Sequence, residues 1–228
     1  MKLKINQLIN FIKLSEQFCS EVNIVSDGTK IEFNVMDVCS ICILYYMIEI
    51  KENEFDIVIN SMVLSKILDV YKNEQDVTIN VYDTNFDISF DSGDSYTIKT
   101  IYTEKTEFDI KSMINEYKTS SEFYSFDMTF DSVSKIDKLI NIFDMDCIEI
   151  CPDTQGVYIK NDDMKTKVSD KDIQYYNNIC ISSKYFSYLK FLKSRNKIFK
   201  IYFNNSMPVL FRNDDIYIFI SPRIDDAS

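Results

Sequence analysis

The chain carries the same order of patterns twice, once in each half. Both copies open with a short alternating segment and an amphipathic stretch, KLKINQLINFIKLSEQF from Lys2 and MTFDSVSKIDKLINIF from Met128. Apolar side chains recur in these stretches at helical spacing. Two strand-like segments around a glycine follow each time, at Gly28 and at Gly156. A repeat of this length is far longer than one solenoid unit, so it predicts two similar domains joined in one chain.

Each copy continues with a second helical stretch that runs into an alternating, strand-like segment. Alternation of apolar and polar residues is typical of strands with one buried face. The sequence therefore predicts an α+β fold with two helices in each domain. The expected helices are Asn6–Phe18, Ser61–Asn73, Asp131–Phe143 and, with its exit, Ser182–Lys197. Residues 106–121 are less periodic, so we expect domains at 1–105 and 122–228 with 106–121 as the interdomain connector.

Composition excludes several kinds of chemistry. The chain has no histidine, which excludes Ser-His-Asp triads, Cys-His dyads and histidine-ligated zinc. The cysteine pairs Cys39/Cys42 and Cys147/Cys151 lie in apolar, strand-like stretches, so we expect buried free thiols and no metal site. No apolar run approaches the roughly 20 residues of a membrane span, and the N-terminus lacks the layout of a signal peptide. These features predict a soluble intracellular protein without a membrane partner.

The formal net charge is −11, which by itself argues against a nucleic-acid partner. Positive charge is nevertheless concentrated on the expected helices and negative charge on the remainder. Such a polarised surface can contact phosphates without reading bases, although helix surfaces can also be lysine-rich for no functional reason. The candidate DNA-facing residues are Lys13, Lys66, Lys72, Lys135, Lys138, Lys184, Lys190, Lys193 and Arg195.

Three segments resemble the sliding clamps of the proliferating cell nuclear antigen (PCNA) type, in the same order. They are KIEFNVMDVCSICILYY from Lys30, FDIVINSMVLSKILDVYKNEQDVTINVYD from Phe55 and MPVLFRNDDIYIFISPRIDD from Met207. The resemblance spans nearly the whole chain, including the duplication. It implies two topologically similar DNA-clamp domains per subunit, with antiparallel sheets outside and four short helices lining the inner face of a ring.

The same resemblance implies a function without catalysis or cofactor. A homotrimeric ring would encircle double-stranded DNA without sequence preference and tether DNA polymerase and other clamp-binding-motif proteins, acting as a processivity factor for replication and repair. A clamp loader would be a further partner. The expected location is at replicating DNA, in the nucleus of a eukaryote or at a viral replication site.

The resemblance also implies a pocket for short partner peptides, which would anchor an aliphatic and two aromatic side chains in it. Ser40 departs from the histidine that is common in the family, and the connector offers three residues in place of the family's usual Leu and Ile-Pro spacing. The implied pocket residues are Met36, Ser40, Ile41, Ile43, Pro208, Phe219, Ser221, Pro222 and Ile224, with Met113, Ile114 and Tyr117 from the connector. Ordinary core packing is the alternative for each.

Ring closure in this family pairs edge strands of neighbouring subunits. The matching segments here are 100–108 and 163–168. Glu104 and Glu107 on one and Lys165 and Lys167 on the other are complementary, which favours one register across the edge, although edge charges can also serve only to block aggregation.

Two other functions stay open at this point. Clustered carboxylates at Asp144, Asp146, Asp162 and Asp163 could indicate a metal-dependent nuclease, but the pattern places them at turns and strand faces. A clamp-like protein with a specialised role, such as a checkpoint clamp subunit or a viral late transcription factor, would have the same fold.

Overall fold

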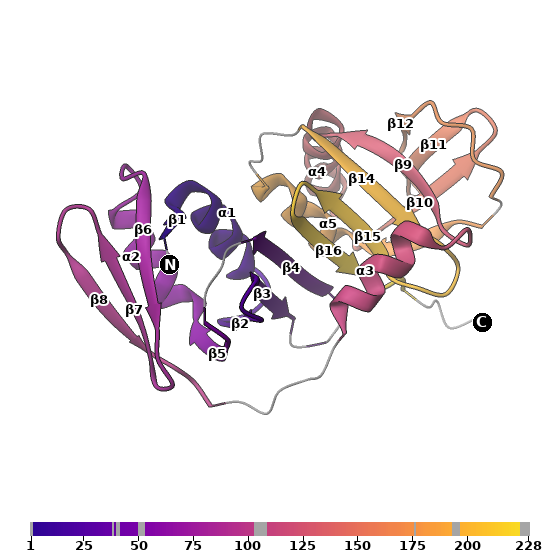
Figure 1. Ribbon diagram of the computed structural model, residues 1–228. Coiled ribbons are helices and arrows are strands. Elements are labelled where there is room, and N and C mark those ends of the chain that lie inside the picture. The colour runs from indigo at the N-terminus through magenta and orange to yellow at the C-terminus, as the bar shows by residue number, and fades with distance from the viewer. Residues whose placement is uncertain are drawn as a thin grey trace. The chain divides into compact units, whose positions relative to one another are not determined.

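The computed structural model has an α+β architecture in which the chain divides into two units, Met1–Phe108 and Asp109–Ser228 (Figure 1). The structure describes residues 2–37, 39, 42–49, 53–102, 109–175, 177–192 and 197–223. Among these residues every pairing between neighbouring strands is antiparallel. Each unit is described separately below.

The first unit contains two helices and two four-stranded sheets. Its elements are β1 (Lys2–Lys4), α1 (Ile5–Ser15), β2 (Glu21–Ser26), β3 (Lys30–Met36), β4 (Cys42–Glu49), β5 (Phe55–Asn60), α2 (Ser61–Val70), β6 (Asp76–Val81), β7 (Asn85–Phe90) and β8 (Ser95–Lys99). One sheet has the order β1-β6-β7-β8, and the other contains β5-β2-β3-β4. The strands β8 and β1 therefore form the two edges of the first sheet.

The second unit repeats this plan after one additional helix, α3. Its elements are α3 (Ile110–Thr119), β9 (Tyr124–Thr129), α4 (Phe130–Phe143), β10 (Cys147–Asp153), β11 (Gly156–Lys160), β12 (Lys165–Ser169), β13 (Ile179–Ser182), α5 (Ser183–Ser187), the 3-10 helix η1 (Tyr188–Phe191), β14 (Ile198–Phe203), β15 (Val209–Asn213) and β16 (Ile216–Ile220). The sheets contain β9-β14-β15-β16 and β13-β10-β11-β12. Strand for strand, these orders match the first unit, so the predicted duplication is confirmed.

Local sequence explains where these elements begin and turn. The side chains of Asn60, Asp109 and Thr129 accept hydrogen bonds from backbone N–H groups of the first helical turns of α2, α3 and α4. Gly156 opens β11 with a φ of 140°, and a Cβ at this position would lie 2.3 Å from the carbonyl oxygen of Ser169 on β12. Only glycine fits such a close approach of two strands.

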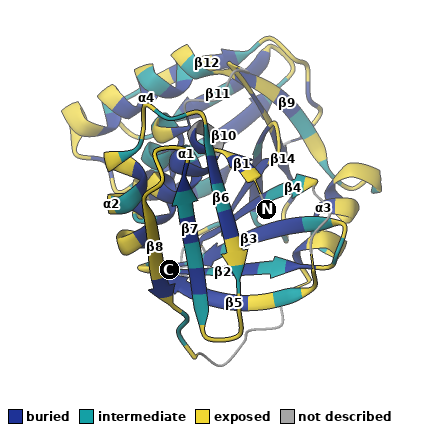
Figure 2. Cartoon of the chain, turned by 60° about the vertical axis from the view of Figure 1, so that its left-hand side comes forward, coloured by how far each residue is buried: buried dark blue, intermediate teal, exposed yellow. Residues whose placement is uncertain are grey.

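Aromatic side chains join the helices to the sheets in both cores. The ring of Phe11 on α1 lies 5.6 Å from that of Phe33 on β3 and 5.4 Å from that of Tyr46 on β4. In the second unit, Phe186 on α5 meets Phe211 on β15 at 6.1 Å. Buried and more exposed residues alternate along β2, β6 and β7, while α2 and α4 each keep an exposed face (Figure 2). The helices thus cover one face of the sheets and keep their other side exposed to solvent.

Two features of the helices differ from the sequence prediction. The segment predicted as a connector holds a fifth helix, α3, whose Ile110, Ile114 and Tyr117 are buried. The predicted fourth helix is shorter than expected, because α5 ends at Ser187 and continues only as the 3-10 turn η1. The proposed boundaries at residues 105 and 122 stay a prediction, although α3 is grouped with the second unit.

The cysteine prediction is right in part. All six cysteines are free, and Cys42 and Cys151 are buried. Burial raises the pKa of the Cys151 thiol to about 12, so this thiol is inert at neutral pH. Cys147 is half-buried and Cys39 is exposed, so burial was wrongly predicted for Cys39.

Candidate DNA-facing and partner surfaces

The helix pair of the first unit carries three of the predicted DNA-facing lysines. Lys13 on α1 donates to Asp69 on α2 at 2.5 Å, so this lysine joins the two helices. Lys66 on α2 and Lys72 just after it are exposed, and neither has an acidic partner among the residues that the structure describes. Both charges are therefore available to an external anion.

The helices of the second unit carry four more. Lys135 and Lys138 on α4 and Lys184 on α5 are exposed, again without an acidic partner in the described part of the chain. Lys190 on η1 differs, because its Nζ lies 3.1 and 3.2 Å from the two carboxylate oxygens of Asp137 on α4. Lys193 and Arg195 lie outside the described residues.

The helix surfaces also expose apolar side chains, which the sequence analysis did not identify. Val70 on α2 is 73% exposed and Ile142 on α4 is 70% exposed. Met62, Val63 and Phe143 on the same two helices are exposed as well. The surfaces are thus mixed, with lysines beside apolar groups, and among the described helix residues the lysines supply the positive charge.

The predicted peptide pocket has one part in each unit. In the first unit, Met36 and Ile43 are cross-strand partners in the β3–β4 ladder, where Met36 is half-buried and Ile43 is buried. Asp37 follows β3, and its side chain accepts hydrogen bonds from the N–H groups of Cys42 at 2.6 Å and Cys39 at 3.3 Å. The Asp37 side chain therefore holds the backbone at Cys39 and Cys42, a role that the sequence analysis did not identify. Ser40, Ile41 and Ile224 lie outside the described residues.

In the second unit, the structure brings the connector residues and the C-terminal residues together. The hydroxyl of Tyr117 on α3 donates to the carbonyl oxygen of Pro208, and its ring meets that of Phe219 edge-on at 5.6 Å. Burial raises the pKa of the Tyr117 hydroxyl well above its usual value. Ile114 lies on the same buried face of α3, and Met113 is half-buried.

The segment after β16 is also fixed in place. Ser221 and Pro222 are half-buried, and the N–H of Arg223 donates to the carbonyl oxygen of Cys180 on β13 at 2.8 Å. This bond holds the start of the C-terminal run against the second unit.

Of the two predicted subunit edges, 163–168 overlaps the edge strand β12, whereas 100–108 begins after the edge strand β8, which ends at Lys99. Lys165 and Lys167 project from β12, an edge strand; Lys165 lies 4.0 Å from the ring centre of Tyr158, and Lys167 pairs with Asp170 at 2.6 Å. The hydrogen bond to Asp170 raises the pKa of Lys167. Glu104 and Glu107 lie outside the described residues. Within the predicted partner segment, Ile101 makes one bridge to Val58, and the sheet edge itself is β8.

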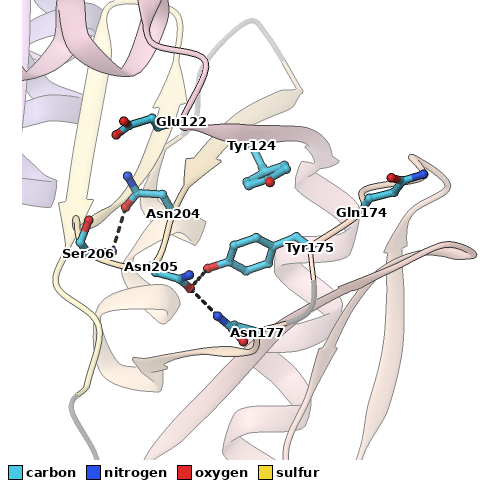
Figure 3. A pocket seen from close by; sticks show the side chains of 8 residues that line it. All are labelled: Glu122, Tyr124, Gln174, Tyr175, Asn177, Asn204, Asn205 and Ser206. Carbon is cyan, nitrogen blue, oxygen red and sulfur yellow. Dashed lines mark hydrogen bonds between the residues drawn. The ribbon is translucent and has the colours of Figure 1, made fainter.

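A polar pocket of about 480 Å³ adjoins the loop that precedes Pro208 (Figure 3). Amide and tyrosine side chains form it, and Tyr175 and Asn177 both donate to the side-chain oxygen of Asn205, the latter at 3.0 Å. The lining residues are Glu122, Tyr124, Gln174, Tyr175, Asn177, Asn204, Asn205 and Ser206. These hydrogen bonds order the loop, and the sequence held no motif that would have indicated the pocket.

No metal site is found in the described ranges, because nowhere in them do three or more Cys, Asp or Glu side chains converge. Asp144 caps α4 in a left-handed conformation, and Asp162 and Asp163 lie in the turn between β11 and β12. The described helices include none that is long and apolar enough to cross a membrane.

Together, the duplicated pair of sheets and the paired helices define the fold of DNA sliding clamps, which confirms the fold that the sequence resemblance implied. The chain is similar to a DNA polymerase III beta subunit from Eubacterium rectale, with a TM-score of 0.80 and 14% identity over 99% of this chain and 65% of that one. It therefore spans a little under two thirds of the length of that protein.

Two PCNA structures match along nearly their whole length. A PCNA2–PCNA3 complex from Sulfolobus tokodaii has a TM-score of 0.76 and 12% identity, covering 98% of this chain and 99% of that one. PCNA from A. fulgidus, with the C-terminal region of FEN-1 bound, has a TM-score of 0.75 and 15% identity over 99% and 98%. No family model and no curated protein matches the sequence.

Proposed function

We propose that the chain is a subunit of a ring-shaped sliding clamp that encircles duplex DNA and acts as a polymerase processivity factor. The observation that carries this proposal is the clamp fold with unpaired lysines on the helices of both units. Five lysines, on α2, directly after α2, on α4 and on α5, are exposed and have no acidic partner in the described residues. They are positive surface groups in a chain whose net charge is −11. Lysines so placed contact phosphates without reading the base sequence.

The proposed ring closes through strand edges. The edge strands β8 and β12 each present unpaired backbone groups, which readily pair with another chain. Pairing β8 of one subunit with β12 of the next joins identical subunits head to tail, and closure at three gives a mass of about 81 kDa, three times 26.9 kDa. Lys165→Glu combined with Lys167→Glu is expected to weaken this oligomer, and an unchanged mass by light scattering at micromolar concentration would count against this edge.

Polymerases and other proteins with clamp-binding motifs are the proposed partners, with a loader to open the ring. They would bind at the residues gathered around Pro208 and Phe219 in the second unit, and the role of Met36 and Ile43 of the first unit in partner binding stays a prediction. A bound FEN-1 segment is present in the A. fulgidus PCNA structure, which supports peptide binding as the partner mode. The place of action would be replicating DNA inside the cell.

Topological retention on DNA tests the proposal without a loader. The protein is mixed with a duplex that is attached to a bead at one end, and the free end is then either left open or blocked by a bulky protein. We expect retention through a high-salt wash only on blocked DNA, because an encircling ring leaves by sliding off an end while ionic contacts are screened.

Two outcomes would redirect the proposal. Equal loss from open and blocked DNA would refute encirclement. Retention on blocked DNA without stimulation of any polymerase on a primed template would instead favour a clamp with a specialised role, such as a checkpoint or late-transcription function.

A further inference from the structure

The strand β16 is buried on both of its faces. All five of its residues, Ile216–Ile220, are buried, although side chains alternate between the two faces of a strand. Ile218 pairs with Phe211, which meets Phe186 of α5, so this face belongs to the core. Tyr217 and Phe219 point to the opposite face, and something other than the core must cover them.

Helix α3 is that cover. Tyr117 meets Phe219, and the Nζ of Lys118 donates to the hydroxyl of Tyr217 at 3.2 Å. Tyr117 also donates to the carbonyl oxygen of Pro208. Figure 1 shows α3 crossing β15 and β16 accordingly. Without α3, the ring of Phe219 would lie exposed beside Leu210, its partner across the β15–β16 ladder, whereas Tyr217 pairs with Arg212, whose guanidinium lies 5.5 Å from the Tyr217 ring centre.

The way α3 is held resembles the binding of a separate amphipathic peptide. It has ten residues and buries a single stripe, Ile110, Ile114 and Tyr117, at positions i, i+4 and i+7. A helix of this length is marginal in water unless it packs against a surface. The order of α3 therefore depends on its docking, and Tyr117 provides the principal anchor, with both an aromatic contact and a hydrogen bond.

We infer that α3 is a built-in occupant of the groove formed by Pro208, Tyr217 and Phe219, and that a partner's amphipathic, aromatic-anchored segment binds this groove by displacing α3. The inference rests on the proposed function in one respect, since it assigns this face to partner proteins. It gives the connector a different role from the one implied by the resemblance, where Tyr117 and Ile114 form a wall of the pocket. An occupant competes with a partner, whereas a wall supports it.

These two roles predict opposite effects of the same mutation on the affinity for a partner peptide. If α3 occupies the groove, the affinity for a partner is reduced by the small fraction of molecules in which α3 is undocked. Tyr117→Ala removes the main anchor and is expected to raise the affinity for an external peptide about 100-fold. Tyr117→Phe removes only the hydroxyl and is expected to raise it about fivefold. If α3 is a wall, both changes lower the affinity.

The probe is a labelled synthetic peptide of residues 109–121 of this chain, measured by fluorescence anisotropy with the full-length protein. The control peptide carries Tyr117→Ala and is expected not to bind. The control protein is Glu116→Ala, because Glu116 is an exposed residue on α3, and it is expected to behave as the wild type. Unchanged hydrogen exchange in β14–β16 establishes that the variants stay folded. If Tyr117→Ala does not stay folded, the affinity change of Tyr117→Phe alone distinguishes the two roles.

A second probe tests the partner half of the inference. An unlabelled peptide with one aliphatic and two aromatic residues on a helical turn is expected to displace the 109–121 peptide from the Tyr117→Ala protein. An affinity that stays equal or falls in both Tyr117 variants would overturn the occupant role, and failure to compete would overturn the partner assignment. Retention on end-blocked DNA is independent of these results, so the clamp proposal and this inference can fail separately.

Discussion

Lys190→Ala removes the lysine that neutralises Asp137 between η1 and α4. The Asp137 side chain is 12% exposed and that of Lys190 is 37% exposed, so the carboxylate is the more buried partner. Two hydrogen bonds, at 3.1 and 3.2 Å, join the ammonium group to both carboxylate oxygens. The alanine variant leaves a largely buried carboxylate without a counter-charge, which is the costly way to break such a pair.

The magnitude follows from this geometry. A hydrogen bond to a charged group is worth about 1.5–3 kcal/mol, and the exposure of Lys190 places the loss toward the lower half of that range because water screens the pair. We expect the free energy of unfolding to fall by about 2 kcal/mol, which corresponds to a Tm lower by about 4–8 °C in a chain of this size. Lys138→Ala is the matched control on α4 and is expected to cost less than about 0.5 kcal/mol.

Urea unfolding followed by circular dichroism measures the change in the free energy of unfolding. A salt titration of DNA binding measures how many phosphates each variant neutralises. Because Lys190 is already neutralised by Asp137, Lys190→Ala is expected to leave the salt dependence unchanged. Lys138→Ala is expected to reduce the slope by about one, because the variant neutralises one phosphate fewer. Equal stability losses in the two variants, or a reduced slope for Lys190→Ala, would refute the reasoning.

Two further predictions concern the sheets. The hydrogen bond from Lys4, aided by Lys2, lowers the pKa of Asp76 and links β1 to β6. Its contribution to the free energy of unfolding is therefore present above the usual carboxyl range of about pH 4 and is lost as pH falls through the lowered pKa. Asp76→Asn should therefore lose less stability than the wild type between pH 7 and about pH 3, and parallel acid-unfolding curves would contradict this. Gly156→Ala is expected to cost more than about 2 kcal/mol, because its Cβ meets the Ser169 carbonyl oxygen at 2.3 Å, whereas Gly93→Ala, with open space, should cost about 1 kcal/mol from its positive φ alone. Urea midpoints compare the two, and equal losses would mean that the close approach of β11 and β12 relaxes freely.

The duplicated fold could be predicted from sequence because the two signals that indicate it, strand alternation and glycine turns, are local. Along β6 and β7 the alternation buries Val77, Ile79, Phe86 and Ile88, as expected for strands with one buried face. The positive φ of Gly28 likewise confirms the predicted turn between β2 and β3. Strand order was not local information, and it entered only through the resemblance to clamps.

The helix α3 was missed although a signal for it exists. Asp109 is a good N-cap residue, and Ile110, Ile114 and Tyr117 follow at helical spacing. The residues between them are polar, so the segment is less hydrophobic on average than α1, α2 and α4, although its apolar residues are as periodic as theirs. A narrow apolar stripe is enough for a helix that packs with one side on the outer face of a sheet and is not enclosed in a core.

Ion pairing sets the remaining limit on what the sequence could predict about the site. Lys13 and Lys190 look like their neighbours in the sequence, but their partners Asp69 and Asp137 are brought to them only by the packing of one helix on another. The two pairs have the same role in the two units, since each joins the first helix of its copy to the second. In the first unit the lysine lies on the first helix, and in the second unit it lies on the second helical segment. The ion pair between the helices is therefore repeated, but not at equivalent positions. A duplicated fold needs its paired helices held together in both copies, and each copy uses one lysine for this purpose. The positive charge available to an external anion is therefore carried by the lysines without such a bridge, and counting helix lysines from the sequence overstates this charge.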